Sequence, residues 1–168
     1  MSISMYQASV PVLQRSLGNL SAILTKAGNW ATARKIDPSV LLASRLAPDM
    51  FPLTRQVQIA CDFGKSTPAR LSGIAPPKYE DTETSLAELQ ARLTRTLEYA
   101  ATFKPAQIDG SEDREITLKL GPNEVKFTGQ AYLLHFALPN FFFHLSMSYA
   151  ILRHNGLDLA KADFIGAA

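Results

Sequence analysis

The feature that most constrains this chain is a long uncharged stretch from Phe127 to Leu152, in which no Asp, Glu, Lys or Arg occurs before Arg153. A helix that is apolar on nearly every side lies buried among other elements. The stretch exceeds the length of a bilayer span, but its polar residues lie on several faces, Pro139 interrupts it, and no basic cluster flanks it. We therefore expect a buried helix surrounded by other helices, and no membrane association.

Three further helices are predicted from apolar residues spaced three and four apart. The first spans residues 3–27, with a kink or a late start at Pro11 and a stop at Gly28 and Asn29 that leaves Trp30 on a connection. The second follows a short helix that opens at residues 37–39; it begins at Pro48 or Pro52, carries small residues such as Gly64 on its inward stripe, and ends at Gly73.

The third helix is predicted over residues 86–103, because Ser85 and Glu88 match a capping box. Its Arg92 and Arg95 are expected to face outward. The acidic run 80–83 before it is interpreted as a solvated linker. Residues 116–127 alternate around a Gly-Pro-Asn turn and predict a β-hairpin before the last helix. The C-terminal tail, which carries Phe164 and Ile165, is expected to pack across the bundle.

Three segments together resemble a known family: ISMYQASVPVLQRSL near the N-terminus, LPNFFFHLSMSYAILRHNG in the uncharged stretch, and KADFIG near the C-terminus. They resemble bacterial proteins of domain-of-unknown-function family 1993, which is grouped with the DinB/YfiT-like helical bundles. This resemblance implies an all-α fold, an antiparallel four-helix bundle, often dimeric. It also implies a metal held by three histidines and, in some branches, thiol-dependent transfer chemistry.

Composition narrows the class of protein further. The 168 residues predict a single domain, 1–168, with one core. The formal charge is only +2 and the basic residues are scattered, so we expect no nucleic-acid binding. Cys61 is the only cysteine, which excludes an intrachain disulfide, and the N-terminus lacks the pattern of a signal peptide. We therefore expect a cytoplasmic protein in which Cys61 is a buried structural residue.

The metal site implied by the resemblance is not predicted to survive. His135 and His144 are nine residues apart, and His144 and His154 are ten apart, so no two of them converge on one ion along a straight helix. The resemblance implies two histidines four residues apart on the last helix and a third on the second helix. In this chain the position four residues before His144 is Asn140, and the second predicted helix has Gln56 or Gln58 but no histidine. Amides are weak ligands for transition metals. We therefore predict no metal and no other cofactor, with a divalent ion at His144 as the less favoured alternative.

The residues that remain are Gln56, Asn140 and His144, a polar cluster inside an apolar bundle that needs partners of its own. The first hypothesis is that they line a degenerate pocket for a small molecule. The second is an active metal-dependent hydrolase or thiol transferase with a non-standard site. The third is a structural homodimer in which the cluster is only a packing feature. A homodimer is also the expected assembly, and the sequence supplies no catalytic residue and no substrate.

Overall fold

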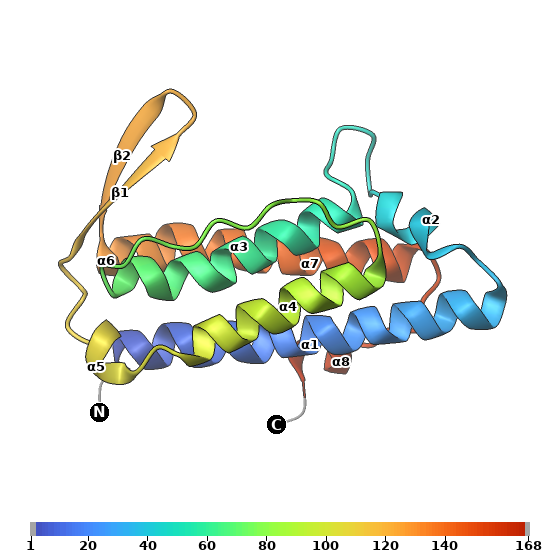
Figure 1. The fold of residues 1–168 in the computed structure, drawn as a ribbon, viewed down its shortest axis with the longest axis horizontal. Helices are drawn as coiled ribbons and strands as arrows, with labels where there is room; N and C mark the ends of the chain where they lie inside the picture. The colour runs from blue at the N-terminus through green and yellow to red at the C-terminus, as the bar shows by residue number, and fades with distance from the viewer. Residues whose placement is uncertain (1–2, 167–168) are drawn as a thin grey trace.

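The computed structural model describes residues 3–166. Four long helices lie side by side and form the bundle (Figure 1): α1 (Met5–Arg34), α3 (Leu53–Leu71), α4 (Leu86–Ala101) and α7 (Leu138–His154). The shorter elements are α2 (Pro38–Ala43), α5 (Pro105–Ile108), β1 (Glu115–Leu120), β2 (Asn123–Thr128), α6 (Gly129–Ala131), the π-helical turn η1 (Tyr132–Ala137) and α8 (Lys161–Ile165). The predicted helical bundle with a hairpin before its last helix is confirmed.

A long connection between α3 and α4 sets the topology. This segment, residues 72–85, is called the strap below; it runs back along the bundle from the end of α3 to the start of α4 (Figure 1). As a result α3 and α4 run in the same direction, while α1 against α4 and α3 against α7 are antiparallel. The strap therefore lies over helical surface along its length.

The first helix differs from its prediction at both ends. It starts at Met5, before Pro11, because Ser4 and Gln7 form a capping box, so a late start is wrong. It also continues through Gly28 to Arg34 and ends where Lys35 adopts a left-handed φ of 55°. The predicted stop at Gly28 fails because the buried stripe continues through Ala27 and Ala31, and packing outweighs the roughly 1 kcal/mol that a helical glycine costs. Trp30 therefore lies within α1.

The two middle helices follow their patterns closely. All of the inward stripe of α3 is buried, and Gly64 lets α1 approach: a Cβ there would lie 2.6 Å from Leu17 Cδ1. The capping box of Ser85 and Glu88 begins α4 as predicted. The short helix α2 follows its N-cap residue Asp37.

The core is divided, contrary to the single core that we expected. The larger group of buried apolar residues lies among α1, α3, α4 and α7. The smaller group lies at the hairpin end of the bundle, where Ile116 and Leu118 of β1 pack near Tyr132 of η1. Phe63 and Leu138 contact both groups. The hairpin is thus held by its base, and a cavity of about 410 Å³ forms at this end of the bundle.

Pro139 explains the π-helical turn. In a regular α-helix the ring of Pro139 would clash with the carbonyl of His135, the residue four before it. The wider turn over Tyr132–Ala137 immediately precedes α7, in which proline occupies the first turn. Such single π turns are frequent at functional sites. None of the helices in residues 3–166 is long and apolar enough to span a membrane.

The C-terminal tail packs across the bundle as predicted. Asn19 of α1 donates to the Phe164 carbonyl at 3.0 Å, Lys26 pairs with Asp163 at 2.6 Å, and the Phe164 ring contacts Tyr149. The three consecutive phenylalanines of α7 separate as their helical positions require: Phe141 is buried, Phe142 packs at the core's edge, and Phe143 is exposed.

Candidate functional site

The structure joins two of the three predicted pocket residues. The imidazole Nδ1 of His144 on α7 lies 2.7 Å from Oε1 of Gln56 on α3, and Gln56 Nε2 donates to the Phe51 carbonyl at 3.1 Å. His144 is only 9% exposed. Burial, and then the charge of Arg55, lower the pKa of His144 to about 4, so its imidazole is neutral near pH 7. In a neutral imidazole, Nδ1–H of His144 donates to Oε1 of Gln56, so both of these atoms have a hydrogen-bond partner.

The third residue, Asn140, is not part of this pair. Its amide donates to the Phe136 carbonyl at 2.7 Å, four residues back, which supports the backbone at the junction of η1 and α7. Asn140 therefore does not depend on His144, and the residue that loss of His144 would leave without a partner is Gln56. His135 and His154 are both exposed, and they lie nine residues before and ten residues after His144.

These residues do not fit the three-ligand metal site that the resemblance implies. Within residues 3–166 no group of three or more His, Cys, Asp or Glu side chains is placed to hold an ion. The Nδ1 atom of His144 is engaged by Gln56, which leaves one imidazole nitrogen and two amides. Imidazole, thiolate or carboxylate ligands are what zinc or nickel requires.

A charged network fastens the strap, and it overturns two sequence interpretations. Arg92 of α4 is buried, not outward, and its guanidinium lies 2.9 Å from Asp62 of α3 and 3.0 Å from both Asp81 and Glu83 of the strap. The acidic run 80–83 is therefore not merely a solvated linker. Helical periodicity placed Arg92 outside the α4 stripe correctly, but the strap covers that face.

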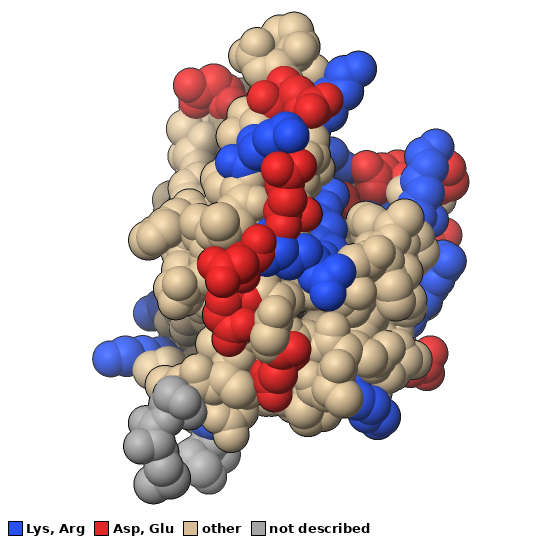
Figure 2. Space-filling view, turned by 90° about the vertical axis from the view of Figure 1, so that its left-hand side faces the viewer, with Lys and Arg blue, Asp and Glu red and all other residues tan. Residues whose placement is uncertain are grey.

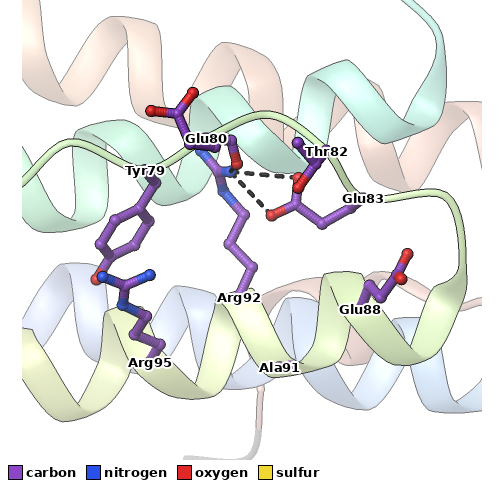
Figure 3. Close-up of a pocket in the computed structure, with 8 residues that line it drawn as sticks. All are labelled: Tyr79, Glu80, Thr82, Glu83, Glu88, Ala91, Arg92 and Arg95. Atoms are coloured by element: carbon purple, nitrogen blue, oxygen red, sulfur yellow. Dashed lines mark hydrogen bonds and ion pairs between the residues drawn. The ribbon is translucent and has the colours of Figure 1, made fainter.

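A small cavity of about 260 Å³ lies between the strap and α4 (Figure 3). Arg92 rises from α4 between Tyr79 and Glu83, and Arg95 lies over the Tyr79 ring at 4.0 Å from its centroid. Burial lowers the pKa of Arg92, but the hydrogen bonds that Arg92 donates to Glu83 and the charges of Asp62 and Glu83 outweigh burial and raise the pKa overall. Because these charges already neutralise one another, the cavity is best explained by the fastening of the strap.

A cavity of about 410 Å³ lies between α3, β1 and η1. We call it the hairpin-end cavity. Its apolar lining is Ile59, Phe63, Pro76, Leu118, Leu120 and Phe136. Phe63 is shared with the polar pair, because its ring stacks on His144 at a centroid distance of 6.5 Å and meets Phe136 at 5.9 Å. The Gln56–His144 pair thus lies behind the aromatic wall of this cavity.

The charged lining of the hairpin-end cavity is mostly basic: Arg55, Lys65, Arg70 and Lys119 against a single acid, Asp62. Figure 2 looks onto this end of the molecule and shows Lys and Arg side chains gathered near its middle, beside a line of Asp and Glu side chains. The chain as a whole carries only +2. Because Arg55 pairs with Asp81 and Lys65 with Asp62, the excess positive charge of the lining is that of Arg70 and Lys119.

Comparison with known proteins places the chain in a family. A family model described as "Domain of unknown function (DUF1993)" matches residues 5–165. The chain belongs to the DUF1993 family. Among solved structures it is similar to the crystal structure of a DinB family member protein from Shewanella denitrificans, with 40% sequence identity, a TM-score of 0.87, and coverage of 97% of this chain and 92% of that one. No curated protein matches the chain.

For this DUF1993 chain, sequence reasoning missed the basic residues of the hairpin-end cavity. The signal was present on α3, where Arg55, Ile59, Asp62, Ser66 and Arg70 follow one another at steps of three or four. This second stripe lies beside the apolar stripe that contains Val57 and Gly64. A helix with one apolar stripe and one neighbouring mixed stripe borders both a core and a cavity.

Neither Cys61 nor Ser148 is activated as a nucleophile in this DUF1993 chain. Burial raises the pKa of the Cys61 thiol to about 12, so the thiol stays protonated, which agrees with its prediction as a buried residue. The Ser148 hydroxyl donates to the His144 carbonyl, as helical serines commonly do, rather than to the imidazole.

Proposed function

We propose that this DUF1993 protein binds a small organic molecule in the hairpin-end cavity and performs no metal-dependent chemistry. The observation that carries the proposal is the cavity itself: about 410 Å³ of space, walled by the aromatic rings of Phe63 and Phe136 and entered past polar side chains. Small-molecule sites in proteins have this volume range, with a mostly apolar lining and a few polar groups that orient the ligand.

The placement of the cavity supports the proposal. It lies against η1, and π turns recur at functional sites because they reposition side chains that a regular helix would direct elsewhere. Behind it, Gln56 and His144 satisfy each other, so the pair braces Phe63 instead of reaching for a ligand. The former ligand positions would then have a supporting role.

A cavity-filling variant tests ligand binding. Ile59 lines the cavity and is partly buried, so Ile59→Trp places an indole in the ligand space. Ile165→Trp makes the same change on α8, outside the cavity. A library of small organic fragments is screened by ligand-observed NMR against all three proteins. We expect fragments that bind the parent and Ile165→Trp but not Ile59→Trp. Fragments that bind Ile59→Trp equally well, or no binding to the parent, would refute the proposal.

Elemental analysis tests the proposed loss of metal chemistry. The protein is purified without a histidine tag or chelator, and zinc, nickel, manganese and iron are measured per chain. We expect values far below one, because His144 lacks imidazole, thiolate or carboxylate neighbours in the described residues. A value near one for any of these metals would restore the alternative of a metal-dependent hydrolase or thiol transferase.

We retain the homodimer as a proposal for the assembly. Two large apolar side chains, Leu134 of η1 and Phe143 of α7, are 44% and 51% exposed in the single chain. Sedimentation velocity over a hundredfold range of concentration tests it, and a monomer throughout that range would exclude it.

A further inference from the structure

Two cations of the hairpin-end cavity, Arg70 and Lys119, have no carboxylate within salt-bridge distance among the described residues, and this points to the chemistry of the ligand. Arg55 pairs with Asp81 of the strap, and Lys65 pairs with Asp62 at 3.1 Å. Lys119 is exposed on β1, whereas Arg70 is partly buried and is held in place by a neighbour. Arg70 has no acidic partner among the described residues, and its Nη1 donates only to the Tyr132 hydroxyl, at 3.2 Å.

The contact with Tyr132 positions Arg70 and uses only one of the N–H groups of its guanidinium. Tyr132 belongs to the π turn and is fully buried, so its hydroxyl is a fixed acceptor for one guanidinium N–H. A guanidinium has five N–H donors in a planar fork that matches a carboxylate. The remaining donors of Arg70, which lines the cavity, are available to a ligand.

A second polar group lies one helical turn away. Ser66 also lines the cavity, is 5% exposed, and its hydroxyl takes part in no hydrogen bond among the described residues. Residues four apart on a helix share one face. Ser66 and Arg70 therefore present a hydroxyl and a guanidinium to the same space, beside the apolar side chains of Phe63 and Phe136. The Ser66 hydroxyl is not among the fully buried unpaired atoms, so water reaches it and a polar group of a ligand can replace that water.

We propose that the ligand is a small organic carboxylate, whose acidic group contacts Arg70 and Ser66 and whose apolar body lies against Phe63 and Phe136. This inference rests on the proposed function and narrows its ligand class. Asp62 is already engaged by Lys65 and Arg92, so it does not compete for Arg70.

The test compares matched pairs of a carboxylate and its primary amide, with 3-phenylpropanoate and 3-phenylpropanamide as the first pair and branched aliphatic pairs after it. Dissociation constants are measured by NMR titration for the parent, Arg70→Met and Lys126→Met. Lys126→Met is the control. Lys126 lies on β2 of the adjacent hairpin and does not line the cavity, and its substitution removes one positive charge, as Arg70→Met does.

We expect the parent to bind the carboxylates at least tenfold more tightly than the amides, since a hydrogen bond to a charged group is worth about 1.5–3 kcal/mol. Arg70→Met removes this preference while leaving the amide affinities within about twofold, and Lys126→Met keeps it. Ser66→Ala weakens the carboxylates by a smaller factor.

Equal affinities of the two members of each pair in the parent, or a preference that survives Arg70→Met, would overturn the carboxylate assignment and leave the proposed function standing. Binding of no pair overturns the assignment too. The fragment screen with Ile59→Trp then decides the proposed function separately, because that screen does not depend on charge.

Discussion

Removal of the Arg92 charge is the sharpest test of how the strap is held. Arg92→Met keeps the length of the side chain and deletes the guanidinium that contacts Asp62, Asp81 and Glu83. Breaking a buried ion pair by removing one partner costs about 3–5 kcal/mol. The three carboxylates keep other partners, namely Lys65, Arg55 and Gln58, so we expect a loss of about 2–4 kcal/mol in the free energy of unfolding.

Arg95→Met is the matched control. Arg95 lies one turn along α4, is exposed, and contacts the Tyr79 ring of the same strap. An exposed cation–π contact is worth about 0.5–1 kcal/mol. For a chain of this size, 1 kcal/mol shifts the melting temperature by about 2–4 °C. Arg92→Met is thus expected to melt roughly 4–16 °C below the parent, and Arg95→Met within about 4 °C of the parent.

Hydrogen exchange locates the effect within the molecule. Loss of Arg92 is expected to speed exchange of the strap amides far more than those of α1, because the network joins the strap to α3 and α4 and includes no residue of α1. If Arg92→Met melts within about 2 °C of the parent, or if its strap amides exchange at the parent's rate, the reasoning that the network holds the strap is wrong.

Three further predictions follow from single sites. Gly18→Ala, where no atom lies within 4 Å of the new Cβ, should raise the unfolding free energy by about 0.5–1 kcal/mol, whereas Gly64→Ala should lower it by about 1–3 kcal/mol through the clash with Leu17; denaturant melts measure both. Stability should be complete above about pH 6.5 and fall by up to roughly 3 kcal/mol toward pH 4, because unfolded His144 takes up a proton before folded His144 does; His144→Gln should lose this part of the slope. Cys61 should resist iodoacetamide in the native protein and react on unfolding.

Local patterns predicted the helices well, because each amphipathic stripe reports burial within its own helix. The capping box of Ser85 and Glu88 fixed the start of α4 to the residue. The stop at Gly28 was wrong for a reason that no local pattern contains: Ala31 packs in the core and extends α1 by two turns beyond the glycine. The π turn, by contrast, follows from Pro139 and could have been anticipated.

The site was harder to predict because its partners are distant in sequence. Gln56 and His144 are 88 residues apart, and only the resemblance suggested that their helices are neighbours. Arg92 was predicted to face solvent because the helical spacing of apolar residues carries no information about a segment that folds back over the helix. The acidic residues that pair with Arg92 were interpreted as a solvated linker for the same reason. An acidic run has the same sequence pattern whether it faces water or contacts a buried arginine.

Asp62 links the strap to the ligand cavity, since one of its oxygens lies 2.9 Å from Arg92 and 3.1 Å from Lys65, and the residue lines the cavity. Arg92→Met therefore leaves Asp62 less neutralised without changing any residue of the cavity lining. A partly exposed charge pair is worth about 0.5–1 kcal/mol, so carboxylates should bind this variant about two- to fivefold more weakly, and added salt should narrow the difference. The matched amides report any displacement of Pro76, the strap residue that lines the cavity, and should be weakened less than the carboxylates. An unchanged carboxylate affinity in a folded Arg92→Met protein would show that the strap and the cavity are electrostatically independent.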